Sequence, residues 1–265
     1  MVSIHNPRIK YLRRLANHRF RDKEKKFLVE GTRFVEEALN STWLVEMLVY
    51  SKKNMGNKRL ESLFKTAADR KVTLIEVEEQ DFSELAQTST PQGIIAVALQ
   101  RGQSLADLET KDGPALLVLV DGVQDPGNLG AIVRSADAAG AGGVLLLKGT
   151  ADIYNPKALR ATMGSIFHVP VIQGISVQDV LSYLKQRGIK TVAGDPRGSK
   201  VLYEIDLKAA CALVVGSEAG GFGSFLRENV DELVRIPMPG RAESLNVSIS
   251  ASIMLYEALR QRGAS

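Results

Sequence analysis

The chain alternates between short apolar runs and longer amphipathic stretches along most of its length. Apolar runs predict buried strands, and apolar residues spaced three and four positions apart predict helices. In the first half, FLVEGTRFVEEAL predicts a strand leading into a helix, with Gly31 at the turn. Further strands are expected over 45–51, 72–78 and 93–99, and helices over 6–20, 59–70 and 82–88. This alternation predicts a small α/β domain.

The second half repeats the alternation with more strongly apolar strands. Strands are expected over 115–121, 143–147, 167–172, 191–195, 211–216 and 232–238, and helices over 128–140, 155–163, 176–188 and 247–262. Strands that are apolar throughout are typical of a parallel sheet covered by helices on both faces. The expected fold class is therefore α/β in both halves, with a parallel sheet in the second.

The polar stretch RGQSLADLETKDGP separates the two halves and predicts a linker. We therefore expect a first domain over 1–100, a linker over 101–113 and a second domain over 114–265. No apolar run is long enough to cross a bilayer, and the N-terminal segment lacks the apolar core of a secretory signal. Cys211, the single cysteine, lies in an apolar run and suits a reducing compartment. We expect a cytoplasmic protein that has no membrane partner.

The basic residues gather at one end of the chain. Residues 1–33 hold ten Lys or Arg and three acidic residues, whereas the remaining chain holds 24 basic and 27 acidic residues. Such a segment suits binding to a phosphate polyanion, although many charge runs are only solvated helix faces. We favour nucleic-acid contact, and the residues expected to make it are Arg8, Lys10, Arg13, Arg14, Lys26 and Arg33.

Ligands of parallel sheets bind beyond the carboxyl ends of the strands, and three loops at such ends stand out. The first, DGVQDPGNLGAIVRS, lacks the G-x-G-x-x-G pattern, and Lys148 stands where a dinucleotide site usually has an acid. A nucleotide-dependent dehydrogenase is therefore disfavoured. Asn128 or Asp125 can cap the following helix, and Arg134 lies beside its apolar stripe. Spacing alone slightly favours a helix cap and a surface arginine over a catalytic site.

The other two loops are GSEAGGFG and IPMPGRAESLNVSISAS. The four glycines of the former allow the backbone to approach a ligand closely, or they form a strand-to-helix turn, and composition supports both equally. In the latter, Ser244 or Asn246 can cap the last helix. The small residues of that helix indicate tight packing against the loops or against a second subunit.

Together, these segments resemble the three motifs of the SpoU (TrmH-type) branch of the SPOUT RNA methyltransferases. DPGNLGAIVRSA matches the first motif, LVVGSEAGGF the second and IPMPGRAESLNVSISASIMLYE the third, in the family's order. KKFLVEGTRFVEEAL and STPQGIIAV resemble the family's small α/β/α substrate-binding domain. The resemblance covers nearly the whole chain, which ends soon after the third motif, so no extra domain is expected.

The resemblance implies a parallel sheet with a deep trefoil knot, which connection rules alone would make very improbable. It also implies a homodimer whose active site draws on both subunits, and S-adenosylmethionine as the cofactor, with no metal. The positions that it assigns to the cofactor are Val215, Gly216, Gly220, Ile236, Met238, Leu245 and Val247.

The implied reaction is methylation of a ribose 2′-hydroxyl in RNA, with large-subunit ribosomal RNA as the expected substrate. Arg134 is expected to bind a phosphate and stabilise the developing alkoxide, because a neutral guanidinium is costly. Asn128, Ser244 and Asn246 would orient this arginine and the ribose, and Glu218 would hold the arginine or its loop. Two alternatives stay open: a tRNA 2′-O-methyltransferase, and a non-catalytic RNA-binding protein of ribosome assembly.

Overall fold

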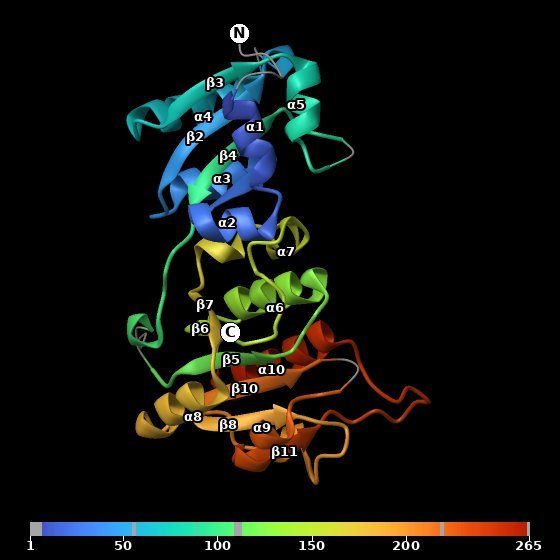
Figure 1. The fold of residues 1–265 in the computed structure, drawn as a ribbon. Helices are drawn as coiled ribbons and strands as arrows, with labels where there is room; N and C mark the ends of the chain where they lie inside the picture. Colours follow the sequence, from blue (N-terminus) through green and yellow to red (C-terminus); the bar gives the residue numbers. More distant parts are fainter. Residues whose placement is uncertain (1–6, 55–56, 89, 109–112, 218–219, 264–265) are drawn as a thin grey trace. The chain divides into compact units, whose positions relative to one another are not determined.

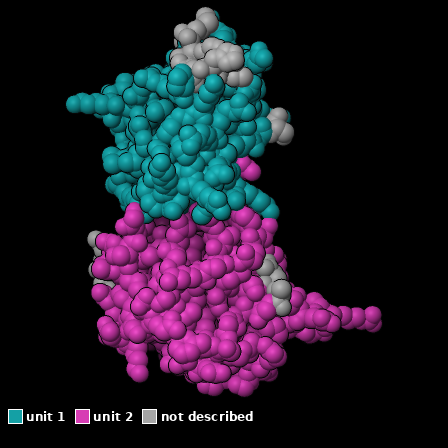
Figure 2. Space-filling view, viewed as in Figure 1, with its two compact units in different colours: residues 1–101, 154–159 teal, residues 102–153, 160–265 magenta. Residues whose placement is uncertain are grey.

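The computed structural model describes residues 7–54, 57–88, 90–108, 113–217 and 220–263 (Figure 1). The chain forms two compact units, coloured separately in Figure 2: unit 1 comprises residues 1–101 and 154–159, and unit 2 comprises residues 102–153 and 160–265. Helix α7 (Pro156–Thr162) therefore begins in unit 1 and ends in unit 2. No pattern in the sequence predicts this assignment of residues 154–159.

Unit 1 is a four-stranded mixed sheet with helices. Its strands are β1 (Lys26–Glu30), β2 (Val45–Ser51), β3 (Thr73–Val77) and β4 (Ile94–Leu99). Their order is β1-β4-β2-β3; β4 runs antiparallel to both of its neighbours, and β2 runs parallel to β3. The helices are α1 (Pro7–Arg14), α2 (His18–Glu24), α3 (Thr32–Asn40), α4 (Lys58–Asp69) and α5 (Glu79–Leu85).

The N-terminal basic segment forms two helices where one was predicted over 6–20. Asn17 begins α2, because its side-chain Oδ1 accepts a hydrogen bond from the Phe20 backbone at 3.3 Å. The apolar stripe of that segment, Ile9, Leu12 and Leu15, is buried, as the spacing predicts. It joins a core cluster with side chains from β1, β2, β3, β4 and α5.

Unit 2 is built on a seven-stranded parallel sheet, which confirms the predicted fold class. Its strands are β5 (Leu116–Asp121), β6 (Gly143–Leu147), β7 (Val171–Ile175), β8 (Lys190–Gly194), β9 (Lys200–Val201), β10 (Cys211–Gly216) and β11 (Glu232–Arg235). The strand order is β7-β6-β5-β10-β8-β11-β9, and every pairing is parallel. In the sheet, β5 therefore lies between β6, the next strand in the sequence, and β10, which comes much later in the chain.

Helices cover both faces of this sheet. They are α6 (Pro126–Ala138), α8 (Val177–Gln186), α9 (Ser224–Asn229) and α10 (Val247–Gln261). Apolar residues of α8 and α9 share one core cluster with the strands, whereas α6 and α10 pack against each other. Ser135 and Ser252 join those two helices through their hydroxyl oxygens, 2.7 Å apart. One of the small residues of the last helix therefore serves packing within the chain.

Two strand predictions in the second half are corrected by the structure, and one helix was missed. The strand expected over 167–172 begins only at Val171, because residues 165–167 form a 3-10 turn and Pro170 precedes it. The strand expected over 232–238 ends at Arg235, two residues before a proline that cannot donate to a ladder. Helix α9 was not predicted at all, since its six residues are too few to show a period.

In the part of the chain that the structure describes, no helix is both long and apolar enough to span a membrane.

Candidate active site

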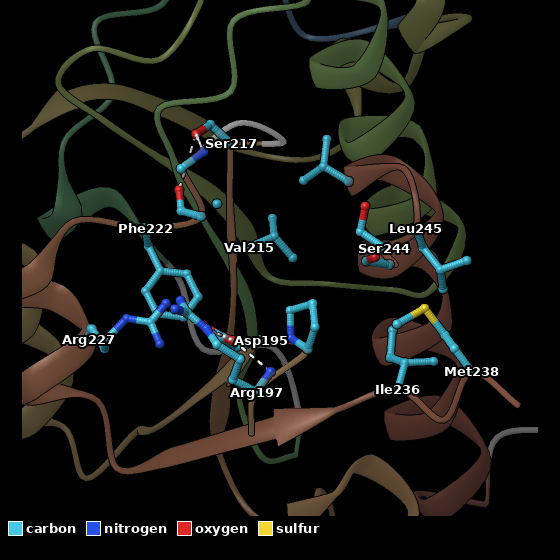
Figure 3. A pocket seen from close by; sticks show the side chains of 17 residues that line it. Asp195, Arg197, Val215, Ser217, Phe222, Arg227, Ile236, Met238, Ser244 and Leu245 are labelled. Atoms are coloured by element: carbon cyan, nitrogen blue, oxygen red, sulfur yellow. Dashed lines mark hydrogen bonds and ion pairs between the residues drawn. The ribbon is translucent and has the colours of Figure 1, made fainter. Parts of the chain in front are cut away.

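The segments that follow β8, β10 and β11 meet at one edge of the unit 2 sheet, because neighbouring parallel strands end on the same side. A cavity of about 450 Å³ opens there (Figure 3). It is lined by Gly194, Asp195, Pro196, Arg197, Val215, Gly216, Ser217, Gly220, Gly221, Phe222, Arg227, Ile236, Met238, Ser244, Leu245, Val247 and Ser250. Its wall thus comes from three segments that lie far apart in the sequence.

All seven positions that the resemblance assigns to the cofactor line this cavity. Val215 and Gly216 end β10, and Gly220 follows in the glycine-rich segment. The remaining four belong to the segment between β11 and α10 or to the start of α10: Ile236, Met238, Leu245 and Val247. In Figure 3 the labelled apolar side chains Ile236, Met238 and Leu245 lie together, across Val215 from Phe222 and Arg227.

The glycine-rich segment folds back on itself directly after β10. The backbone N–H groups of Ser217 and Gly221 each donate to the other residue's carbonyl oxygen at 2.8 Å. A Cβ atom on Gly216 would lie 2.3 Å from the Gly221 carbonyl carbon, which no real side chain tolerates. Gly221 itself has φ +67°. These two glycines are therefore required by contact within the chain, independently of any ligand.

The first and third loops are joined by a hydrogen bond between two of the predicted site residues. The Asn246 side-chain amide donates to Asn128 Oδ1 at 3.0 Å. Asn246 also begins α10, since its Oδ1 accepts from the Ser248 backbone at 2.9 Å. The cap of α6 is Asp125, whose carboxylate accepts from the Asn128 backbone at 2.9 Å. Of the candidate caps predicted from the sequence, Asp125 therefore caps α6 and Asn246 caps α10.

The other predicted catalytic residues are placed differently. Ser244 lines the cavity and is exposed. Arg134 is exposed on α6, does not line the cavity, and makes no hydrogen bond or ion pair with residues that the structure describes. Glu218 lies outside the described residues. The cavity of one chain therefore gathers the predicted cofactor residues but not the predicted catalytic arginine.

Three charged residues of the cavity were missed by the sequence analysis: Asp195, Arg197 and Arg227. A signal existed for Asp195, because an acid at the carboxyl end of an apolar strand of a parallel sheet lies at the ligand-binding edge. No comparable signal marked Arg227, which lies on the unpredicted helix α9. Asp121 is the last residue of β5, whereas Asp195 directly follows β8, and Asp121 Oδ2 accepts from the Gly223 backbone at 2.9 Å.

Comparison with known proteins decides the family. Residues 115–256 match the model of the SpoU rRNA Methylase family, and residues 6–96 match that of the MRM3-like substrate binding domain. The chain belongs to the SpoU rRNA methylase family. The family predicted from the three motifs is thus confirmed, and the SpoU match spans every segment that lines the cavity.

Methyltransferases named for ribosomal RNA match almost the full length of this chain. The chain is 35% identical to the Bacillus subtilis 23S rRNA (guanosine(2553)-2′-O)-methyltransferase RlmP, over 96% of both proteins. It is 31% identical to the 23S rRNA (uridine(2479)-2′-O)-methyltransferase of Streptomyces viridochromogenes, over 94% of this chain and 87% of that protein. The AdoMet-bound rRNA methyltransferase from Sinorhizobium meliloti has a similar structure, with a TM-score of 0.88, 34% identity and coverage of 98% and 97%. These SpoU proteins confirm the predicted enzyme class and its cofactor, S-adenosylmethionine.

The basic residues predicted to bind RNA lie in unit 1, within the MRM3-like match. Arg8, Lys10, Arg13, Arg14 and Arg33 are exposed. Arg13 donates to Glu84 at 2.8 Å, and Lys26, half-buried, pairs with Glu46. One further basic residue of the segment, Arg21, is buried and binds the Leu15 and Ala16 carbonyl oxygens at 3.1 and 2.6 Å. Some of the basic residues of this segment therefore stabilise the fold of unit 1 through contacts within it.

Proposed function

We propose that this chain transfers a methyl group from S-adenosylmethionine to a ribose 2′-hydroxyl of large-subunit ribosomal RNA. One observation supports this proposal above all. The seven residues that the family resemblance assigns to the cofactor come from two segments of the chain, and all seven line one cavity. Its volume of about 450 Å³ falls within the usual range of ligand pockets, about 300–1,000 Å³. Both relatives named above act on 23S rRNA at a ribose 2′-oxygen, one at guanosine and one at uridine.

The cavity suits S-adenosylmethionine in chemistry as well as in size. Ile236 and Leu245 offer an apolar surface to a flat heterocycle, and the turns around Gly194 and Gly216 present backbone polar groups without a side chain. When bound, this cofactor supplies a methyl group that its sulfonium already activates. The protein is then left to orient the ribose and to help its hydroxyl lose a proton. We keep three further expectations: the trefoil knot that the resemblance implies, the domain limits at 100 and 114 that the polar linker predicts, and the cytoplasmic location that the single cysteine suits.

For the chemistry we assign an electrostatic role to Arg134. A guanidinium has a pKa above about 12 and stays charged, so it is suited to hold a phosphate and to stabilise an alkoxide. The Asn128–Asn246 hydrogen bond fixes the start of α10 against α6, the helix that carries Arg134. We assign to Ser244, which lines the cavity, the role of orienting the ribose, and to Glu218, which lies outside the described residues, that of holding the arginine or its loop.

We infer that the active unit is a homodimer in which Arg134 completes the cavity of the partner subunit. Arg134 is exposed outside its own cavity, as described above. Ile249 and Tyr256 lie seven residues apart on one face of α10 and are 51% and 52% exposed. The segment over 239–243 is exposed throughout and extends away from the sheet in Figure 1. A second copy of the chain would cover these surfaces.

Mixing two inactive variants tests this arrangement. Arg134→Ala keeps the cavity, and Leu245→Arg fills it while keeping Arg134. If the arginine acts on the partner's cavity, co-refolded variants at equal amounts should regain about a quarter of wild-type activity, because half of the dimers contain one intact site. No recovery in a sample that sedimentation shows to be mixed dimers would place Arg134 at its own cavity instead.

Unit 1 would supply affinity for RNA through its basic residues. Replacing the exposed Lys10, Arg14 and Arg33 by Ala should weaken binding to ribosomal RNA and reduce the slope of log K against log salt by about 2. Phosphate contacts position without specifying sequence, so the site of methylation should not move. As a matched control, three exposed lysines of unit 2 are replaced: Lys185, Lys200 and Lys208. An equal reduction of the slope by both sets would contradict the assignment.

The proposed activity is tested by incubating the protein with methyl-labelled S-adenosylmethionine and, separately, purified 23S rRNA, 16S rRNA and tRNA. Label is expected in 23S rRNA, and Leu245→Arg should abolish both the transfer and the calorimetric binding of the cofactor. Label confined to tRNA would support the tRNA alternative. RNA binding without cofactor binding by the wild-type protein would support the non-catalytic alternative.

A further inference from the structure

A buried carboxylate at the cavity has no part in the site predicted from the motifs. Asp195 directly follows β8, and its side chain is only 4% exposed. Its backbone N–H donates to the Val234 carbonyl oxygen on β11 at 2.8 Å, which fixes its position at the edge of the sheet. Burying a charged group costs several kcal/mol unless other groups compensate it. The partners of Asp195 therefore show what the residue stabilises.

Both oxygens of Asp195 are occupied by arginines. Its Oδ1 accepts from the Arg197 backbone at 2.8 Å and from Arg197 Nε at 3.3 Å, and its Oδ2 forms an ion pair with Arg227 Nη2 (Figure 3). Burial acts to raise the pKa of Asp195, but these hydrogen bonds outweigh it and hold the pKa below its usual value. The carboxylate is thus ionised at neutral pH, and the pair with Arg227 is fully formed.

Arg227 connects this carboxylate to the glycine-rich wall of the cavity. Its guanidinium carbon lies 5.0 Å from the centre of the Phe222 ring, and its Nη2 lies 3.8 Å from where a Cβ on Gly221 would be. Its backbone N–H donates to the Gly223 carbonyl oxygen at 3.0 Å. Phe222 is 5% exposed and lines the cavity. The arginine, 27% exposed, therefore packs between Asp195 and the wall that Gly221 and Phe222 form.

The strand order explains why the wall needs this support. β10 lies between β5 and β8, so the segment that leaves β10 has one neighbouring strand end on each side. On the β5 side, Asp121 accepts from the Gly223 backbone at 2.9 Å. On the β8 side, no backbone hydrogen bond among the described residues ties the segment to the strand end, and the Asp195–Arg227 pair makes the link.

We propose that Asp195 is a positioning residue for the cofactor: through Arg227 it holds Gly221 and Phe222 in place and so sets the affinity for S-adenosylmethionine. The proposal rests on the assignment of this cavity to the cofactor. The pair is separate from Arg134 and from the Asn128–Asn246 contact. Weakening it therefore changes cofactor affinity and leaves the rate at saturating cofactor unchanged.

The test uses Asp195→Asn, Arg227→Met and the double variant in the full-length protein. Each single variant should raise the calorimetric Kd and the KM for S-adenosylmethionine about tenfold, while kcat on RNA at saturating cofactor stays within about twofold. The double variant should be no worse than the single ones, because both act on one contact. A fall in kcat without a change in KM would overturn the proposal.

Stability separates a positioning role from a merely structural one. Removing one partner of a buried ion pair is strongly destabilising, whereas removing both is often nearly neutral. The double variant should therefore regain much of the stability lost in the singles but none of the cofactor affinity. If the double variant recovered wild-type affinity for S-adenosylmethionine together with its stability, the Asp195–Arg227 pair would support only the fold.

A matched control comes from α10. Glu257 is 6% exposed and pairs with Arg260 at 2.8 Å, away from the cavity. Glu257→Gln should lower the stability of the protein but leave its Kd for S-adenosylmethionine unchanged. A tenfold rise of the Kd in this variant would overturn the proposal. If Leu245→Arg binds the cofactor as tightly as the wild type does, the assignment of this cavity to the cofactor is wrong. That result differs from a failure of the positioning role of Asp195 alone.

Discussion

Gly216→Ala is the smallest change that should close the proposed cofactor site. The added Cβ would lie 2.3 Å from the Gly221 carbonyl carbon, 2.4 Å from its oxygen and 2.5 Å from the Phe222 nitrogen. All three are backbone atoms, so no side chain can rotate away. To reach an ordinary carbon–carbon contact, the segment must withdraw by about 1 Å.

The size of this displacement determines the expected losses of stability and of cofactor affinity. Overpacking of this kind costs about 1–3 kcal/mol of stability, and a displacement of about 1 Å at a binding wall can cost about a hundredfold. We therefore expect the Kd for S-adenosylmethionine to rise about a hundredfold, or about 2.7 kcal/mol, while the protein stays folded. Isothermal titration calorimetry measures the affinity, and urea unfolding measures the stability.

Gly142→Ala is the control for the same substitution in the same sheet. Its added Cβ would meet nothing closer than 3.7 Å, and Gly142 precedes β6, away from the cavity. Its cofactor affinity should equal that of the wild type. A Gly216→Ala protein that binds S-adenosylmethionine within threefold of the wild type would show instead that the wall formed by Gly221 and Phe222 is free to move.

Three further predictions concern stability. Asn246→Ala removes the cap of α10 and the bond to Asn128, so unfolding in urea should show a loss of about 1–2 kcal/mol; an unchanged midpoint would contradict the cap assignment. Arg262→Met leaves four backbone carbonyl oxygens without their guanidinium donor, which should cost about 3 kcal/mol with no change in cofactor Kd by calorimetry; a changed Kd would be unexpected. Hydrogen bonds from Lys200 and Lys190 lower the pKa of Glu232 from its ordinary 4.5, so its stabilisation is complete above that value and is lost as pH falls through the lower folded pKa. The stability difference between wild type and Glu232→Gln should accordingly shrink below about pH 4.5 in urea titrations, and a constant difference would count against the ion pairs.

Sequence patterns were most informative where local chemistry determines the structure. The apolar run over 211–216 predicts a strand, and β10 has the same bounds. The same holds for Arg134, since a period of 3.6 residues puts it beside the stripe of Leu129, Ile132 and Val133, which is buried. Asn246 was one of two candidate caps of the last helix, and only the three-dimensional structure distinguishes it from Ser244.

Features that depend on strand order could not be predicted in this way. The pairing of Asp195 with Arg227 requires that β10 lie next to β8, and no local pattern encodes that order. The need for glycine at position 216 likewise comes from a fold-back onto Gly221 rather than from a ligand. The grouping of residues 154–159 with unit 1 is a third case, because it arises from long-range packing alone.

The position of the transferred methyl group on the RNA tests the proposed reaction. Large-subunit ribosomal RNA is methylated by the wild-type protein with labelled S-adenosylmethionine, digested to nucleosides and analysed by mass spectrometry. One labelled 2′-O-methylnucleoside is expected, and it should be absent when Arg134→Ala replaces the wild type although that variant still binds the cofactor. A label on a base, or near-normal methylation by Arg134→Ala, would contradict ribose methylation that depends on Arg134.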